Sequence, residues 1–212
     1  MQDTKKEKKQ LRRELEESLR ALSPEERAER SKQACRNLVS TQQFIDASTI
    51  MIYLSLPHEV DTAEAILHAW QMDKIVVVPK ISWQQRHMIP VRINTLETGF
   101  STEVTGLRNP VTGTPIPPAD IDMVITPALG VDSSGNRLGR GGSFYDNFFV
   151  NPQLNSSRCG LVFSEQVIER VPITDHDQPL DLIVTDKEVI YHKGHRSAKA
   201  QTPTDRQPGT AR

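Results

Sequence analysis

The residues best suited to chemistry lie in one glycine- and arginine-rich stretch, 135–146, which reads GNRLGRGGSFYD. Its glycines let the backbone take positive φ angles and bring N–H groups close to an anion. Arg137 and Arg140 add forked, permanently charged donors that suit phosphate oxygens. The stretch matches neither GxxxxGK[ST] nor GxGxxG. By itself it therefore predicts either an anion-binding loop or a structural turn.

A second basic group lies near the start of the chain. Lys8 and Arg12 are four residues apart, so on a helix they share a face and can converge on one phosphate. The plainer alternative is a solvated face on which Arg12 pairs with Glu16.

Three acidic residues could complete a site. Glu59 follows an apolar run, and ligands of open parallel sheets bind beyond the carboxyl ends of strands. Asp146 closes the glycine-rich stretch, and Asp177 lies in the acid-rich segment 172–181, which suits either a metal-facing loop or ordinary turn chemistry. Each acid is also a common loop or helix-capping residue. The 6 His show no metal-ligand spacing.

Two helices at the N-terminus must position the first basic group. Leucines at 11, 15, 19 and 22 recur with the period of one helix face. Ser23, Pro24 and Glu26 then predict a new helix that opens with a capping box and runs towards Val39.

The rest of the chain alternates short apolar runs with helical or loop segments, which predicts a mostly parallel sheet covered on both faces. The pattern predicts helices over 62–71 and 144–150. The first two strands with the 62–71 helix form a βαβ unit, so these strands should be parallel. The expected strands are 49–54, 74–78, 88–93, 121–125, 158–163, 181–185 and 188–192.

Composition excludes several classes of function. In the 212 residues, 26 Lys and Arg nearly balance 27 Asp and Glu, so no overall field favours nucleic acid or an anionic membrane. No apolar run approaches a membrane span, and the charged start does not resemble a secretion signal. Cys35 and Cys159 form no CxxC pattern, so we expect free thiols and a cytoplasmic protein. We also expect a monomer. Residues 1–192 should form a single domain, and the polar segment 193–212 a disordered tail.

Taken together, these segments resemble the 5-formyltetrahydrofolate cyclo-ligase family over roughly residues 5–190. Each motif is weak alone, but their order and spacing are those of the family. The matching segments are Lys8 to Arg12, Ser23 to Arg27, Tyr53 to Ser55 with Glu59, Val78 to Lys80, Asp132 with Gly135 to Gly141, Tyr145 with Asp146, and His176 to Asp181.

The resemblance implies a three-layer α/β/α sandwich, related to sugar-phosphate isomerases and CoA transferases, that uses 5-formyltetrahydrofolate, ATP and Mg²⁺. It implies catalytic roles for Arg137 and Arg140. The ATP site would comprise Lys8, Lys9, Gln10, Leu11, Arg12, Arg137, Leu138, Gly139, Arg140, Gly141, Gly142, Ser143, Phe144 and Tyr145. The folate site would comprise Leu54, Glu59, Arg140, Gly141, Gly142, Ser143 and Phe144. Asp146 and Asp177 would hold the metal, directly or through water.

Some positions depart from the family pattern. Ser143 and Phe144 replace a glycine and a tyrosine, Asn109 stands where Glu is typical, and Val131 replaces an aromatic residue. Two alternatives remain. One is a folate- or nucleotide-binding protein without catalysis. The other is a sugar-phosphate isomerase of the same fold, which would not need ATP but would require a general base near the loop.

Overall fold

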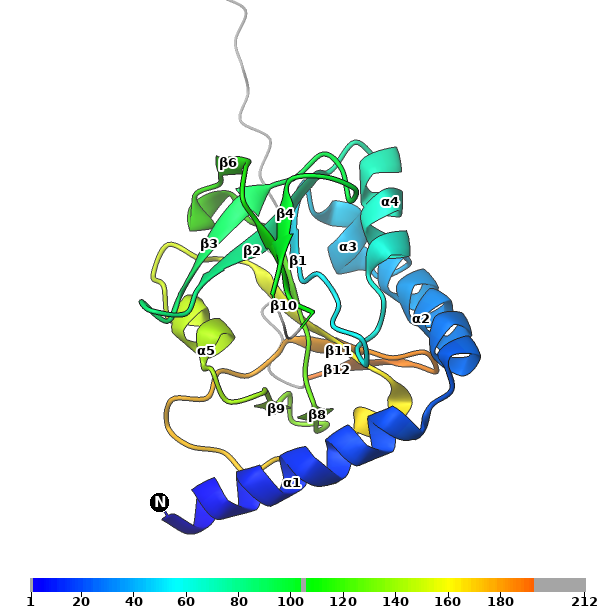
Figure 1. The fold of residues 1–212 in the computed structure, drawn as a ribbon, viewed down its shortest axis with the longest axis vertical. Helices are drawn as coiled ribbons and strands as arrows, with labels where there is room; N and C mark the ends of the chain where they lie inside the picture. Colours follow the sequence, from blue (N-terminus) through cyan, green and yellow to red (C-terminus); the bar gives the residue numbers. More distant parts are fainter. Residues whose placement is uncertain (1, 104–105, 193–212) are drawn as a thin grey trace, which may run out of the picture.

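The computed structural model describes residues 2–103 and 106–192 as an α/β fold around one large sheet (Figure 1). The strand order in this 8-stranded sheet is β12-β11-β10-β7-β1-β2-β3-β6. Its strands are β1 (Thr49–Ile52), β2 (Ile75–Ser82), β3 (His87–Arg92), β6 (Thr114–Pro115), β7 (Met123–Thr126), β10 (Ser157–Leu161), β11 (Leu182–Val184) and β12 (Val189–Tyr191).

The centre of the sheet is parallel. β1 pairs in parallel with β2 and β7, and β10 with β7 and β11. Strands β12, β3 and β6 extend the two edges in antiparallel pairs. The predicted α/β class and mostly parallel sheet are therefore confirmed, including the parallel β1–β2 pair around helix α4 (Ala63–Gln71).

Alternate residues of the central strands enter two separate cores, because successive strand side chains point to opposite faces. Ile50 and Ile52 belong to one buried cluster, together with residues of α4 and of the three helices that precede β1. Met51 belongs to the other, which contains Phe148 and Phe149 of the short helix α5 (Phe144–Phe149). One outer layer is thus mostly helical, and the other is α5 with loops.

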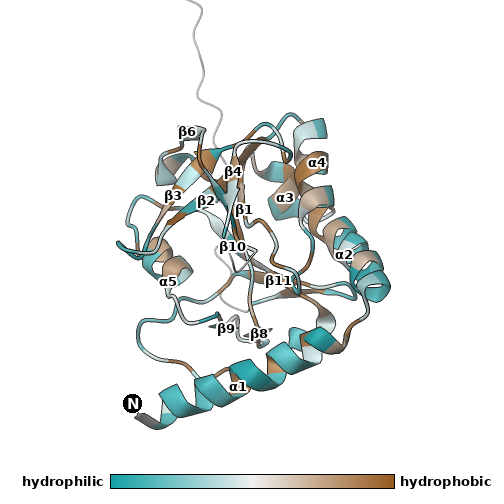
Figure 2. Cartoon of the chain, viewed as in Figure 1, coloured by the Kyte–Doolittle hydropathy of each residue, from teal (hydrophilic) through white to brown (hydrophobic). Residues whose placement is uncertain are grey.

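The N-terminal helical pair is confirmed, as α1 (Gln2–Ala21) and α2 (Pro24–Val39). Ser23 caps α2 with the expected capping box: its hydroxyl accepts from the Glu26 N–H, and the Glu26 carboxylate accepts from the Ser23 N–H. Helix α1 is largely hydrophilic and crosses one end of the sheet (Figures 1 and 2). Only Leu15, Leu19 and flanking residues bury an apolar stripe.

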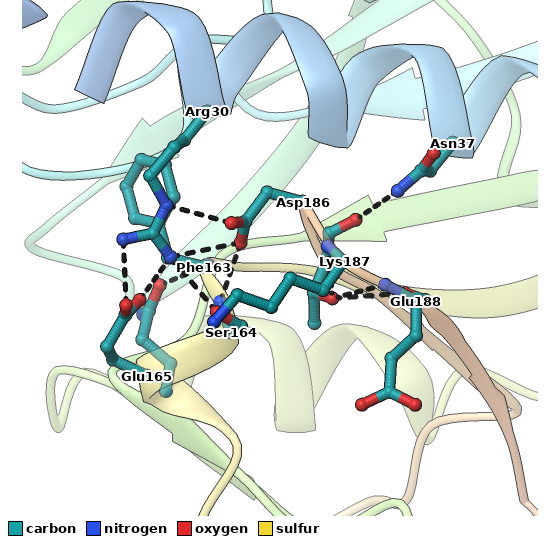
Figure 3. Close-up of polar contacts among 10 residues, drawn as sticks. Arg30, Asn37, Phe163, Ser164, Glu165, Asp186, Lys187 and Glu188 are labelled. Atoms are coloured by element: carbon teal, nitrogen blue, oxygen red, sulfur yellow. Dashed lines mark hydrogen bonds and ion pairs between the residues drawn. The ribbon is translucent and has the colours of Figure 1, made fainter. Parts of the chain in front are cut away.

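Arg30 ties α2 to the carboxyl ends of β10 and β11 (Figure 3). Its guanidinium donates to the carboxylates of Asp186 and Glu165 and to the Ser164 hydroxyl. Asn37, two turns further along α2, donates to the Thr185 carbonyl at 2.8 Å. These contacts fix the helix against the sheet.

Several short elements lie outside the sequence prediction. They are α3 (Gln42–Asp46), the two-stranded ribbon of β4 (Phe100–Thr102) and β5 (Arg108–Pro110), strand β6, the pair of β8 (Gly130–Val131) and β9 (Arg137–Leu138), and the 3-10 turns 118–120 and 164–166. The predicted tail, 193–212, lies outside the described residues. Among the helices described, none has the length and apolar character needed to cross a membrane.

Candidate active site

A cleft of about 690 Å³ opens where the parallel strands end. Tyr53 and Leu54 follow β1, Pro79 lies in β2, and Pro127 follows β7, and all four line the cleft. Lys8 and Arg12 of α1 line it too, as does the loop from Arg137 to Asn147. The cleft thus lies at the carboxyl edge of the parallel strands, where ligands of such sheets are expected to bind.

The glycine-rich loop begins as an antiparallel pair and is then held by α1. β8 pairs with β9, which contains Arg137. Beyond it, the Arg12 side chain donates through Nε to the Gly139 carbonyl at 2.8 Å. Gly141 has a φ of 101°, which a side chain would strain. Arg12 therefore does not pair with Glu16, and both basic segments face one cleft.

Arg137 is buried but incompletely bonded. It donates to Asp146 Oδ2 at 3.1 Å and lies over the Tyr145 ring, 5.4 Å from its centroid. Its Nε is buried without a hydrogen-bond partner among the described residues. A buried unpaired donor is costly unless something supplies an acceptor. An anionic ligand in the cleft would supply one.

Arg140 joins the loop to two acids from different elements. Its Nε lies 3.1 Å from Glu59 Oε1, and one terminal nitrogen lies 3.0 Å from Glu16 Oε1 on α1. Glu59 is only 6% exposed, and its other oxygen accepts from the Leu56 N–H at 2.9 Å. Glu59 therefore shapes its own loop and also presents a buried carboxylate to the cleft.

The two predicted metal ligands line the same cleft, each paired with a cation. Asp146 Oδ2 is paired with Arg137, and Asp177 Oδ2 with Lys8. Burial raises the pKa of Asp177, but hydrogen bonds from Lys8 and Thr174 outweigh it, so the pKa lies below its ordinary value. The bonds to Thr174 also make Asp177 part of a tight turn.

This donor set suits Mg²⁺. The described residues contain no cluster of three or more His, Cys, Asp or Glu that could enclose a metal. Mg²⁺, however, is usually bound by one or two carboxylates together with substrate phosphates. Asp146 and Asp177 offer two carboxylates beside a cationic loop, so they fit a metal that arrives with a phosphorylated ligand.

The structure separates the predicted ATP residues of α1. Lys8 and Arg12 face the cleft, whereas Lys9, Gln10 and Leu11 are not among its lining residues. Lys9 and Gln10 are exposed, and Leu11 packs against the core. Helical periodicity accounts for this, because only positions three or four apart share a face.

The loop positions that depart from the family pattern also line the cleft. Ser143 has φ 54° and ψ 19°, in the left-handed region. Phe144 packs edge-on against Trp83, with ring centroids 5.1 Å apart. The Tyr145 side chain is partly buried in the cleft wall, and burial raises its pKa above the ordinary value.

Other lining residues carry no prediction from sequence. Lys5, one turn before Lys8, could have been found from helical spacing. Trp83, Arg86 and Arg108 come from the β2–β3 turn and from β5. Nothing local in the sequence indicates that these segments fold over the cleft, although Pro79, Ile81 and Trp83 do alternate as one face of a strand would.

Comparison with known proteins identifies the family of this chain. The profile of the 5-formyltetrahydrofolate cyclo-ligase family matches residues 4–186. The 5-formyltetrahydrofolate cyclo-ligase of Mus musculus is 31% identical over 195 residues, which cover 87% of this chain and 93% of the mouse protein. That of Escherichia coli K12 is 27% identical over 183 residues, covering 80% and 95%.

Solved structures give the same result. The NMR structure of 5,10-methenyltetrahydrofolate synthetase from Aquifex aeolicus superposes with a TM-score of 0.76 at 27% identity, covering 93% of this chain and 99% of that one. A synthetase from Mycoplasma pneumoniae, 21% identical with a TM-score of 0.69, shares the fold. Since the family profile spans nearly all of the described chain, this protein belongs to the 5-formyltetrahydrofolate cyclo-ligase family.

Proposed function

We propose that the protein uses ATP to close 5-formyltetrahydrofolate to 5,10-methenyltetrahydrofolate, releasing ADP and phosphate. The observation that carries the proposal is a single cleft in which the arginines of the glycine-rich loop adjoin the buried carboxylate of Glu59. The arginines suit a polyphosphate, and the carboxylate suits the paired N–H donors of a pterin ring.

The chemistry needs activation because a formamide oxygen is a poor leaving group. The formyl oxygen attacks the γ-phosphorus of ATP, an O–P bond forms, and the bond to ADP breaks. N10 then adds to the formyl carbon and loses its proton. Phosphate departs with the C–O bonding pair, which leaves the methenyl bridge.

This route asks the protein for positioning and charge, not for a covalent nucleophile. Arg140 would leave Glu59 and Glu16 to contact the migrating phosphoryl group, and the unpaired Nε of Arg137 would find its acceptor there. Lys8 and Arg12 would hold the remaining phosphates. Asp146 and Asp177 would hold Mg²⁺, which neutralises phosphate charge when bound.

We further propose a monomer that works in the cytoplasm. Cys35 and Cys159 are both buried and free, as a reducing compartment favours. Sedimentation of the purified protein with and without ligands tests the monomer.

The decisive experiment follows near-ultraviolet absorbance of the methenyl product in purified protein given Mg²⁺, ATP and 5-formyltetrahydrofolate. We expect an absorbance rise that requires ATP. Arg140→Ala should lower kcat by about 10²–10³-fold, because it removes a donor that acts on developing charge. Arg13→Ala, an exposed residue of the same helix as Arg12, is the matched control and should leave kcat unchanged.

Two outcomes would contradict the proposal. Folate binding without ATP consumption would indicate a binding protein that has lost catalysis. Turnover of sugar phosphates without ATP would indicate the isomerase alternative.

A further inference from the structure

One wall of the cleft is a track formed by Pro79 and Ile81 of β2 and by Trp83, which follows the strand in the β2–β3 turn. Pro79, Ile81 and Trp83 all line the cleft, and residues two apart on a strand share a face. From Pro79 to Ile81 the strand covers about 7 Å, and Trp83 follows just beyond the end of β2. The β1–β2 register, in which Met51 lies beside Val77, places Pro79 next to Tyr53. The track therefore starts near the Glu59 end and leads away from it.

The ribbon β4–β5 and its flanks hold this track in place. The Asn109 side chain on β5 accepts from the Ile81 N–H and donates to the Ile81 carbonyl, both at 2.9 Å. The Trp83 indole N–H donates to the Glu103 carboxylate, 2.9 Å away at the closer oxygen. Phe144 packs on the Trp83 ring. The track is thus an ordered, largely apolar surface.

A second, smaller cavity of about 280 Å³ begins where the track ends. It shares three lining residues with the main cleft, Arg86, Phe144 and Asn147. Its polar lining comprises Arg86, His87, Asn147 and Asn151, and includes no acidic residue among those described. Arg86 lies in the β2–β3 turn, is exposed, and makes no side-chain hydrogen bond or ion pair with the described residues.

This inference rests on the proposed function, whose substrate is 5-formyltetrahydrofolate. The parts of that molecule follow one another in the same order as the cleft, the track and the second cavity. Its pterin ring leads through an aminobenzoyl ring to a glutamyl tail with carboxylates. A cavity of 300–1,000 Å³ suits one drug-sized ligand, so a 690 Å³ cleft that must also admit ATP leaves part of the folate outside. With the pterin at Glu59, the aminobenzoyl ring would lie along the track and the tail would reach Arg86.

We propose that the second cavity, with Arg86 as its charged residue, is the subsite for the glutamyl carboxylates of the folate. Arg86 offers forked donors that match a carboxylate, and Asn147 and Asn151 offer further amide donors. Arg86 is thereby a specificity-determining residue that discriminates between folates with and without an acidic tail.

The test compares 5-formyltetrahydrofolate with 5-formyltetrahydropteroate, which keeps both rings and N10 but lacks the glutamate. Arg86→Gln should raise KM for the folate about tenfold, the effect of losing one charge-assisted hydrogen bond. It should leave kcat, KM for ATP and KM for the pteroate unchanged. Gln keeps a Cβ at the φ of 47° that Arg86 adopts, so the backbone strain is the same.

Controls separate this role from a structural one. Arg92→Gln removes an exposed arginine of β3 that lines neither cavity and should change nothing. Arg86→Lys, which keeps the charge, should restore most of the folate affinity. An unchanged KM for folate in Arg86→Gln, or an equal rise for folate and pteroate, would overturn the subsite while leaving the cyclisation reaction standing.

If the wild-type protein produces no methenyl compound, calorimetric binding of the same two compounds decides the matter. A tail-dependent loss of affinity in Arg86→Gln would support the subsite without the reaction. Failure of the wild-type protein to bind either compound would overturn both proposals.

Discussion

At the residue scale, Ser143 carries the clearest strain in the cleft. Its left-handed backbone, with φ 54° and ψ 19°, costs an L-residue with a Cβ about 1–2 kcal/mol. Glycine, which the resemblance leads one to expect at this position, would meet the same turn without that cost. The departure noted from sequence is therefore a conformational one, and the serine side chain makes no capping hydrogen bond to offset it.

Replacing Ser143 by glycine should raise the free energy of unfolding by about 0.5–1 kcal/mol, since relief of strain exceeds the added entropy of the unfolded chain. Urea unfolding of the two proteins measures it. Ser133→Gly is the control: Ser133 is an exposed turn residue without a positive φ, and this change should lower stability. Equal effects of the two substitutions would refute the strain at Ser143.

Most of the predicted site residues could be placed from sequence because they lie in continuous motifs. The loop 137–146 and the Lys8–Arg12 pair follow from glycine freedom and helical spacing. The sequence could not identify the partner of each charged residue. Arg140 pairs with Glu16 and Glu59, which are 124 and 81 residues away in the chain. The pair with Glu16 depends on how α1 crosses the sheet.

At the scale of elements, the side-chain amide of Asn109 fastens the ribbon β4–β5 to β2. Asn109 meets both the N–H and the carbonyl of Ile81, which only a side chain with a donor and an acceptor can do. Asn109 stands where a Glu is typical of the family, and a carboxylate could accept from the N–H but not donate to the carbonyl.

Asn109→Asp should therefore leave the Ile81 carbonyl without a donor and next to a negative charge. We expect a loss of about 1–3 kcal/mol in unfolding free energy and a higher KM for the folate, because Ile81 lines the cleft. Asn94→Asp, at an exposed position, adds the same charge without touching β2. If both variants unfold at the same urea concentration, the amide does not fasten the ribbon.

The sequence pattern missed the end of β2 and the short strands β5 and β6. The apolar run predicts a strand over 74–78, whereas β2 runs from Ile75 to Ser82. It continues to Ser82 because β1 has ended by then, and β3 alone pairs with it there. Strands of two or three residues such as β5 and β6 show no alternation that a pattern could detect, so their existence depends on tertiary contacts.

At the scale of the whole molecule, the Arg30 cluster joins the helical layer to the sheet. The hydrogen bond from Arg30 lowers the pKa of Glu165 against the effect of burial. For Asp186, burial raises the pKa, but the bonds from Arg30 and the Ser164 N–H outweigh it and leave it lowered. A lowered folded pKa contributes stability above the unfolded value near 4, and that contribution is lost as the pH falls through the folded pKa.

Arg30→Met should lower the unfolding free energy at pH 7 by about 2–3 kcal/mol, the range for hydrogen bonds to charged groups. Urea unfolding measured from pH 7 to pH 3 should show that the difference in unfolding free energy between the variant and wild type becomes smaller below about pH 4, where both acids become protonated. Arg36→Met, which breaks the exposed pair with Glu29, should cost under about 1 kcal/mol at every pH. A gap that stays constant with pH would mean that Arg30 acts through packing on Phe163.

Three of the cations that line the cleft are paired with an acid, and this pairing affects which anions can bind to them. Lys8, Arg137 and Arg140 are each paired with a carboxylate of the protein. An anion that binds to one of them must therefore displace that carboxylate as well as water. A small monoanion replaces one such partner with another of equal charge and gains little. A chain of linked phosphates replaces several at once for a single loss of translational freedom. The carboxylates paired with these three cations thus compete with the ligand for them. This competition favours a ligand with several linked phosphates over one with a single phosphate.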